Sequence, residues 1–395
     1  MKAFSRIFKN SRKDALRSQE CESERTNTVN KSENNSGCTR EHSSPDPVSG
    51  TPIDSAELAD IIAKHGHAPA TAWLERERYH VWRPSSPQSS AGSFLPIQGY
   101  LCADGWVFAW GSPIVPEKKE DEIRRVAIAF VEWVQSHHLR PVYCCVDAEL
   151  EDILGNMGWS TVHCINEDVI DAEHVLELTS EDDKGGHGPM VKDLKKNLRR
   201  AARAKIEVVR INREEWTQEL REEVEAGIEE WKKNRKGLQL AATSFDPWLD
   251  FENRLYWVAK KGEKLVGILI LTPAGDSYVI KNCVSFPDAP KGTSERLIHD
   301  GLQDLDNKRE QGGSMSVTFN ISAAGDLEPT RNISGWKFTW LSQTYRNVSK
   351  GANLLQRSDF RRKFDASKEP MFVCYLTEDG FGWDGIETLL RLLRR

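Results

Sequence analysis

The sequence predicts an α/β fold made of two similar lobes, because one order of elements occurs twice along the chain. In each half, short strands joined by hairpin turns come first, an amphipathic helix follows, and a buried strand comes after that helix. A long basic helix is expected between the halves, and a disordered tail before them. The length of 395 residues agrees with two or three domains of about 150 residues each.

The composition excludes several classes of protein. The net charge of −6 excludes a uniformly basic nucleic-acid coat, so any nucleic-acid surface must be local. The sequence contains no stretch of roughly 18 apolar residues, which a helix would need to span a bilayer. No Cys/His cluster has the spacing of a metal site, so no metal is expected. The cysteines are sparse, and the N-terminus lacks the apolar core of a secretory signal. We therefore expect a cytoplasmic protein that could also associate peripherally with intracellular membranes.

Residues 1–50 are expected to form the disordered tail. Beyond Cys21 they are polar and rich in Ser and Asn, so they cannot bury enough apolar surface to offset the chain entropy. Nearer the N-terminus, Phe4 and Phe8 lie among Lys and Arg at helical spacing, a pattern typical of helices that lie on membranes. A disordered basic tail or a targeting address would explain the same residues.

The first lobe is expected over residues 51–185. Two strands flank the turn at Asp104-Gly105, and the apolar residues of EDEIRRVAIAFVEWVQS recur at helical spacing. PVYCCVD indicates a buried strand, AELEDILGNMG a short helix, and WSTVHCI and HVLELTS two further strands.

The second lobe, over residues 213–395, repeats this order. A helix over REEWTQELREEVEAGIEEWKK precedes three strands with turns near Gly262 and Gly275, and the helix TSERLIHDGLQDLDN precedes the strands SMSVTFNIS and MFVCYLT. An antiparallel hairpin set, a helix and then a parallel strand is the order of acetyltransferase-like (GNAT) folds. The sequence therefore predicts tandem GNAT-like lobes, of which the second is expected to be catalytic.

The connecting helix, expected over residues 186–212, concentrates positive charge. Nine Lys and Arg oppose two acids between residues 189 and 213, in a chain that is acidic overall. Such a patch predicts a polyanion site, and RNA phosphates are the favoured ligand because cations along one helix can follow a backbone. Anionic lipid headgroups are the second alternative, and a solvated linker helix paired with nearby acids is the simplest one.

Two shorter segments also carry candidate residues. In PDAPKGTSE, Lys291, Gly292 and Thr293 stand before the second-lobe helix, whose free N–H groups could hold a phosphate, although Thr293 could equally be a plain N-cap. In FRRKFD, Arg361 and Lys363 belong to a run of three cations that could neutralise a phosphate or stabilise an oxyanion. A solvated charge run is the alternative for this second segment.

In this order and at this spacing, the segments resemble the phosphatidylglycerol lysyltransferase C-terminal domain family (DUF2156). The resemblance rests on WGSPI, LKKNLRRAARAKIEV, PDAPKGT and RRKF, and it covers roughly residues 55–390. That family has two GNAT-like lobes joined by a basic helix, and it moves an amino acid from an aminoacyl-tRNA to a lipid hydroxyl. It implies charged tRNA as co-substrate, no other cofactor and no metal. The tRNA-binding residues that it implies are Lys195, Lys196, Arg199, Arg200, Arg203, Lys291, Gly292 and Thr293.

Two places depart from the pattern of the bacterial members. Ser112 stands where the family usually has Asp, and Lys281 and Val284 replace an Asp-x-x-Arg pair just before the PDAPKG turn. The changed pair argues against phosphatidylglycerol as the acceptor. A fungal branch of the family aminoacylates sterols instead, and this sequence is most similar to its freestanding form, which makes ergosteryl-3β-O-glycine. The expected partners are therefore glycyl-tRNA and a membrane sterol.

The reaction that the resemblance implies is acyl transfer from the tRNA ribose to the sterol hydroxyl. Lys363 matches a lysine of the family motif Tyr-Lys-x-Lys-Phe that is implicated at the active site, and Lys363 or Arg361 could stabilise the oxyanion. Lys281, Asn282 and Asn320, at strand ends that face the expected cleft, complete the catalytic candidates.

An apolar acceptor needs an apolar route, and two segments could supply it. The C-terminal GIETLLRLLRR is amphipathic and basic, so it could touch a membrane or pack on its own domain. Second-lobe aromatics could line the route, although most buried aromatics are core. These aromatics are Trp231, Trp248, Phe251, Tyr256 and Trp257.

Other functions remain open at this point. Aminoacylation of phosphatidylglycerol or another lipid would need only a different acceptor. CoA-dependent N-acyl transfer is the usual chemistry of GNAT folds, but PKGTSE has fewer glycines than their phosphate loop. A protein that binds RNA or membranes without catalysis would also explain the changes at Lys281 and Val284.

Overall fold

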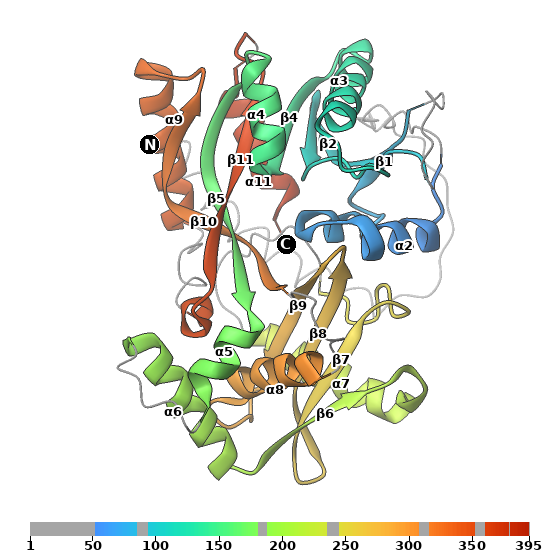
Figure 1. Ribbon diagram of the computed structural model, residues 1–395, viewed down its shortest axis with the longest axis vertical. Helices are drawn as coiled ribbons and strands as arrows, with labels where there is room; N and C mark the ends of the chain where they lie inside the picture. The colour runs from blue at the N-terminus through green and yellow to red at the C-terminus, as the bar shows by residue number, and fades with distance from the viewer. Residues whose placement is uncertain are drawn as a thin grey trace, which may run out of the picture. The chain divides into compact units, whose positions relative to one another are not determined.

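The described strands all belong to one eleven-stranded sheet, with helices packed against it (Figure 1). The expected tail over residues 1–50, including its amphipathic beginning, lies outside the described residues. The computed structural model describes residues 52–84, 94–180, 188–234, 245–307, 316–351, 360–378 and 380–394.

The first half of the sheet follows the expected order. Its strands are β1 (His80–Trp82), β2 (Gln98–Ala103), β3 (Trp106–Trp110) and β4 (Arg140–Val146). The first three are antiparallel, and β4 runs parallel to β3. Between them, α3 (Glu120–Ser136) buries one apolar stripe, which includes Val126, Phe130 and Val134. The expected hairpin, helix and parallel strand are thus confirmed.

The second half repeats the arrangement. Its strands are β6 (Ile206–Ile211), β7 (Leu255–Lys261), β8 (Lys264–Ala274), β9 (Ser277–Ser285) and β10 (Ser316–Arg331). From β6 to β9 neighbouring strands are antiparallel. After β9 comes α8 (Thr293–Asn307), and β10 then returns parallel to β9. Both halves therefore have the strand order that the sequence predicts for GNAT-like lobes.

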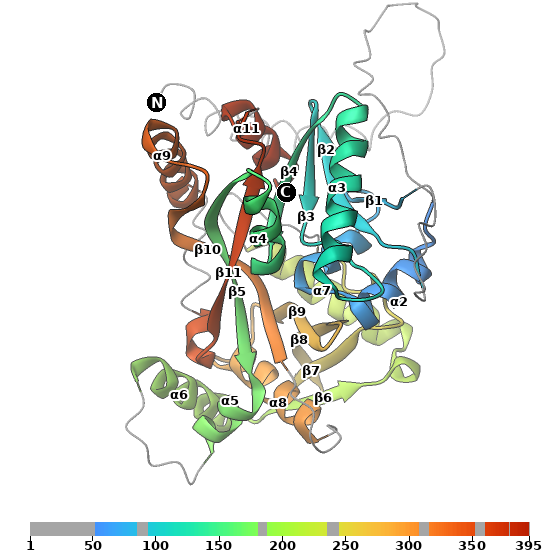
Figure 2. The ribbon, with the colours of Figure 1, turned by 45° about the horizontal axis from the view of Figure 1, so that its top comes forward.

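Long strands join the two halves into one sheet. They are β10, β5 (Ser160–Asp171) and β11 (Ser367–Tyr375). Across the sheet the order is β1-β2-β3-β4-β11-β5-β10-β9-β8-β7-β6. The late strand β11 thus lies between β4 and β5 and completes the first half, while β10 pairs with β5 on one side and β9 on the other. Figure 2 shows β5, β10 and β11 crossing at the centre.

Helices and short 3-10 turns occupy the connections. They are α2 (Ser55–His65), η1 (Ala68–Leu74), α4 (Ala148–Asn156), α5 (Ala172–Thr179), α6 (Pro189–Arg203), η2 (Arg213–Glu215), α7 (Gln218–Lys233), α9 (Gly335–Gly351), η3 (Arg362–Phe364) and α11 (Trp383–Leu392).

Two expectations about these elements need correction, and one helix was not expected. The segment HVLELTS forms helix α5 rather than a strand, because Asp171 caps its first turn and accepts a hydrogen bond from the N–H of His174 (3.1 Å). The connecting helix expected to reach residue 212 ends at Arg203, and the β-branched residues that follow form edge strand β6 instead. Helix α9 has no counterpart among the expected elements.

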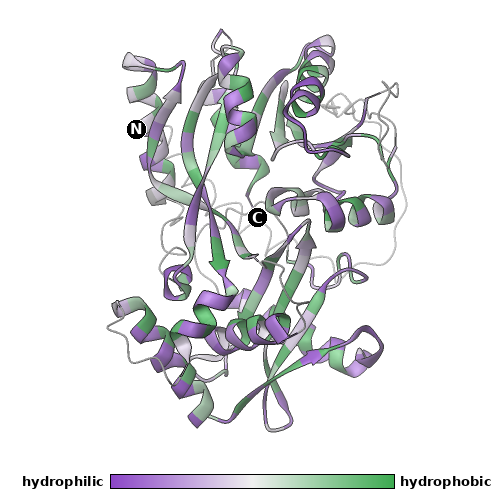
Figure 3. Ribbon diagram, in the orientation of Figure 1, coloured by the Kyte–Doolittle hydropathy of each residue, from purple (hydrophilic) through white to green (hydrophobic). Residues whose placement is uncertain are grey.

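Apolar side chains cover both faces of the sheet. Along β3, Val107 and Ala109 pack in the cluster formed with α3, whereas Phe108 and Trp110 pack in the cluster that contains α2. This alternation follows from the two-residue period of a strand. In Figure 3 the hydrophobic colour concentrates on the strands, while the helices carry hydrophobic and hydrophilic bands.

Replacing Val373 by Asp tests the place of β11. Val373 is 6% exposed and pairs with Cys144 of β4 and Val162 of β5, so a carboxylate there would lose its water without gaining a partner. We expect urea denaturation to show a loss of about 3 kcal/mol or more in the free energy of unfolding. Lys368→Asn, at the exposed end of the same strand, should cost less than about 0.5 kcal/mol. Equal costs would contradict the buried position of β11.

Candidate active site

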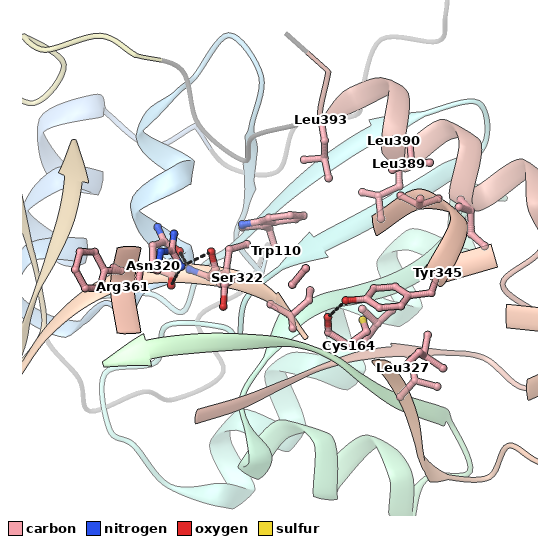
Figure 4. A pocket seen from close by; sticks show the side chains of 18 of the residues that line it. Trp110, Cys164, Asn320, Ser322, Leu327, Tyr345, Arg361, Leu389, Leu390 and Leu393 are labelled. Carbon is pink, nitrogen blue, oxygen red and sulfur yellow. Dashed lines mark hydrogen bonds between the residues drawn. The ribbon is translucent and has the colours of Figure 1, made fainter. Parts of the chain in front are cut away.

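A cavity of about 540 Å³ lies where the two halves of the sheet meet (Figure 4). Its lining comes from β3, β5, β9, β10 and β11, together with α9, α11 and Arg361. The volume falls within the range of about 300–1,000 Å³ that is common for small-molecule sites. Most of the lining is apolar, and the polar groups gather at one end.

Four of the five predicted catalytic residues line the cavity. They are Lys281, Asn282, Asn320 and Arg361, and the structure adds Ser322, which was not among the predicted residues. In Figure 4, Asn320, Ser322 and Arg361 lie on one side of Trp110, and Tyr345 and the leucines of α11 lie on the other. The cavity therefore has a polar end and an apolar end.

Register shifts in two strands place these polar residues. On β9, Asn282 pairs with Ile270 and Ile280 pairs with the next residue of β8, so Lys281 is left as an extra residue without a partner in the ladder. Consecutive residues of a regular strand alternate between faces, but a bulge changes that direction. This explains why residues 280–283 all reach the same cavity.

A second register shift lies on β10. Thr318 pairs with Val169 and Ile321 pairs with Glu167, so residues 319 and 320 both face Asp168. Asn320 takes a left-handed backbone conformation with φ 65°, which Asn tolerates better than most residues. Its side-chain Oδ1 accepts a hydrogen bond from the N–H of Ile321 (2.7 Å).

Arg361 fills the gap that this irregularity leaves in the ladder. Its Nη1 donates to Asp168 Oδ2 (2.6 Å) and to the carbonyl oxygens of Asn320 (3.2 Å) and Ile321 (3.1 Å). The side chain of Asp168 is 2% exposed and that of Arg361 14%, so the ion pair is largely screened from water. Within the described chain, the hydrogen bonds of Arg361 are all made by Nη1.

Two buried polar atoms of the cavity lining have no hydrogen-bond partner among the described residues. They are Asn282 Oδ1 and Ser322 Oγ, and both side chains line the cavity. An unpaired buried polar atom costs free energy, so such atoms are usually satisfied by a ligand or water. Lys281 is held differently, because its Nζ lies 3.4 Å from the carbonyl oxygen of Thr71.

The apolar end is built mainly by α9 and α11. Leu341, Tyr345 and Val348 of α9 line it, together with Leu389 and neighbouring leucines of α11. The hydroxyl of Tyr345 lies within hydrogen-bond distance of the carbonyl oxygens of Cys164 (2.8 Å) and Ala324 (2.7 Å). The expected C-terminal amphipathic helix, α11, packs against β2 and β3 of the first half, although the sequence places it in the second lobe.

The aromatic route expected through the second lobe is not part of this lining. Trp231, Trp248 and Phe251 pack instead around the hydrophobic cluster that holds Tyr256, and Trp257 belongs to a neighbouring core cluster. These rings are core residues, which is the simpler of the two explanations for them.

Comparison with known proteins identifies the family. The sequence of residues 69–375 matches the family described as phosphatidylglycerol lysyltransferase, C-terminal. The chain belongs to this family. No curated protein matches the sequence at a significant level. Because the family transfers amino acids from aminoacyl-tRNA to lipids, this lysyltransferase-family chain is an aminoacyltransferase that uses aminoacyl-tRNA.

Solved structures agree with the fold of this family. One is L-PGS from Bacillus licheniformis, at 15% identity and a TM-score of 0.66, covering 88% of this chain and 98% of that one. Another is the C-terminal domain (DUF2156) of a protein assigned as lysylphosphatidylglycerol synthetase from Agrobacterium fabrum, at 17% identity and a TM-score of 0.62. It covers 86% of this chain and 96% of that one.

Lys363, the lysine that matches the family motif, does not line the cavity. Its Nζ lies 2.9 Å from Asp193 of α6 and 2.9 Å from Glu295 of α8. Burial lowers the pKa of Lys363, but the hydrogen bonds to these two carboxylates outweigh it and raise that pKa above its usual value. The lysine thus stays charged and ties α6 to α8, and its role on the oxyanion stays a prediction.

The basic residues of α6 form an open surface. Lys196, Arg199, Arg200 and Arg203 are exposed, and Lys195 is half-buried. Within the described chain, Lys196, Arg199 and Arg203 form no ion pair, although the charge of Lys196 helps to lower the pKa of Asp193. Other cations of the basic segment are paired with carboxylates, Arg210 with Asp304 (3.2 Å) and Arg213 with Glu252, so the linker interpretation stays open.

Two of the three predicted tRNA-binding residues in the turn before α8 help to pack the fold. Gly292 has φ 97°, and a Cβ there would collide with the carbonyl oxygen of Asn197, so glycine allows α6 and α8 to approach closely. Thr293 is 1% exposed and donates to the carbonyl oxygen of Pro290 (2.8 Å). Of the three tRNA-binding candidates here, Lys291 is the exposed one.

Other kinds of chemistry find little support at the cavity. Cys164 and Cys283 line it, but burial raises the pKa of each thiol to about 12, so neither is a thiolate near neutral pH. Among the described residues, no three His, Cys, Asp or Glu side chains lie close enough together to hold a metal ion. No helix in this part of the chain is long and apolar enough to cross a membrane.

Proposed function

We propose that the chain transfers glycine from charged tRNA to the 3β-hydroxyl of ergosterol. The polarity of the cavity supports a sterol acceptor, because a sterol is a rigid hydrocarbon with one hydroxyl at its end. The apolar end would hold the hydrocarbon, and the polar end around Arg361 and Ser322 would receive the hydroxyl. The choice of glycine rests on the resemblance to the freestanding sterol branch of the family.

The donor would approach from α6. Its exposed cations offer charges to the tRNA phosphates, and α6 packs against η3, which directly follows Arg361. Lys363 of η3 is paired with Asp193 of α6, so the tRNA surface and the polar end of the cavity are joined by a short rigid segment. This arrangement would bring the aminoacyl ester at the tRNA 3′ end to the cavity.

The reaction itself would be a direct acyl transfer. The sterol oxygen attacks the ester carbonyl, the C–O bond to the ribose breaks, and the ribose oxygen leaves with the proton that the sterol hydroxyl gives up. Asn282 Oδ1 or Ser322 Oγ would accept the hydrogen bond of the attacking hydroxyl, and Arg361 would stabilise the developing oxyanion. Because the ester is already activated, positioning supplies much of the rate.

The proposal is tested by transfer with purified protein. Ergosterol and glycyl-, aspartyl- or lysyl-tRNA are mixed with the full chain, and the lipids are analysed by mass spectrometry. We expect glycyl-ergosterol that disappears when the tRNA is digested with RNase beforehand. Another amino acid on the sterol would correct the donor, and product only on added phosphatidylglycerol would correct the acceptor. Turnover with acyl-CoA alone would contradict the proposal.

Arg361→Gln is expected to lower kcat by about 10²- to 10³-fold, the usual effect of removing an oxyanion donor. Arg362→Gln, an exposed neighbour, serves as the control and should keep full activity. Because Arg361→Gln leaves Asp168 buried without its partner, the double variant with Asp168→Asn separates folding from chemistry. Full activity of a folded double variant would exclude a catalytic role for Arg361.

Ser322→Ala should weaken transfer without lowering the stability of the fold. The Ser322 hydroxyl is buried without a partner among the described residues, so its removal should leave the free energy of unfolding unchanged within about 0.5 kcal/mol, or raise it. Transfer should nevertheless weaken, with the KM for ergosterol raised about fivefold or more by one lost hydrogen bond. Loss of stability without any change in KM would show that Ser322 does not meet the acceptor.

Charge reversal on α6 tests the tRNA surface. Lys196→Glu with Arg199→Glu should weaken tRNA binding and reduce the slope of log K against log salt by about 0.7–0.9 for each lost phosphate contact. Lys118→Glu with Lys261→Glu makes the same change of charge elsewhere on the surface and should have little effect. Equal effects in a filter-binding titration would attribute binding to net charge alone.

A further inference from the structure

Two tryptophans are exposed side by side on the outer face of α9. The side chain of Trp336 is 77% exposed and that of Trp340 is 39% exposed. They are four residues apart, so they project from one face of the helix. The other large apolar residues exposed in the described chain are Met157, Met190 and Val209, which lie apart from each other in sequence and are less exposed than Trp336.

The opposite face of the same helix lines the cavity. Leu341, Tyr345 and Val348 contribute to the apolar end, while α9 packs along β10 (Figures 1 and 2). A helix with its side chains is about 10–12 Å across. The exposed tryptophans are therefore separated from the apolar end of the cavity by little more than the thickness of one helix.

The charge of α9 is also distinctive. Its sequence GWKFTWLSQTYRNVSKG contains three basic residues and no acidic residue, in a chain whose net charge is −6. Lys337 lies between the two tryptophans and is exposed, whereas Arg346 is paired with Asp326 (3.0 Å). Positive charge beside exposed indole rings matches the surface of a membrane, where anionic phosphates lie above the hydrocarbon.

We propose that Trp336 and Trp340 dock α9 onto a lipid bilayer, with Lys337 among the headgroup phosphates. Indole rings favour this zone because they combine a large apolar surface with one N–H donor. Docking in this orientation would bring the acceptor lipid within one helix of the cavity that receives it. The use of the bound lipid rests on the proposed function, whereas the docking itself does not.

Vesicle sedimentation tests the docking in the absence of tRNA. The full chain is mixed with vesicles of phosphatidylcholine, phosphatidylserine and ergosterol, and the bound fraction is compared between the natural protein and Trp336→Ala/Trp340→Ala. We expect the partition coefficient to fall about tenfold or more. Met157→Ala/Val209→Ala removes apolar side chains of about 40% exposure elsewhere and should leave binding unchanged. If a segment outside α9 also binds lipid, it adds the same amount of binding to every variant, so the difference between variants still reports on the tryptophans.

Equal binding of both double variants, or no binding by the natural protein, would overturn the proposal. The proposal would also be overturned if the natural protein is a dimer in solution and only Trp336→Ala/Trp340→Ala makes it monomeric. The exposed face would then join two copies of the chain. Transfer to detergent-dispersed ergosterol separates the two ideas. Activity there should survive Trp336→Ala/Trp340→Ala, and its absence in every variant would contradict the proposed function while leaving tryptophan-dependent docking intact.

Discussion

The buried ion pair between Arg361 and Asp168 holds the centre of the molecule together. Asp168 lies on β5, and Arg361 also binds two carbonyl oxygens that the irregular ladder between β5 and β10 leaves unused. Removing one member of a buried pair costs about 3–5 kcal/mol, because the other charge then lacks both water and partner. The same contacts fix the guanidinium at the polar end of the cavity. One side chain therefore joins β5 to β10 and is held in place in the cavity lining.

The cavity owes its two ends to different parts of the chain. Register shifts on β9 and β10 occur where Lys281, Asn282 and Asn320 enter the cavity lining. Helices that follow β10 and β11 supply the leucines of the other end. A surface of this kind can accept a molecule that is apolar along its length and polar at its tip, which agrees with a lipid acceptor in this aminoacyltransferase family.

The basic helix and the cavity are mechanically connected. Lys363 bridges Asp193 of α6 and Glu295 of α8, and Gly292 permits these two helices to approach. A cation in such a position is well placed to hold neighbouring elements and is less suited to giving up a proton. The exposed cations of α6 thus lie on a helix that packs against η3, the turn that directly follows Arg361.

The sequence by itself determined the repeated hairpin, helix and strand order, because that order depends on local hydrophobic period and turn residues. It also located the basic patch of α6 and four polar residues that line the cavity. Only the tertiary structure decided that β11 completes the first half, that Ser322 joins the site, and that α9 and α11 form its apolar wall. These features depend on strand pairing between distant segments and on bulges, and neither has a local signal in the sequence.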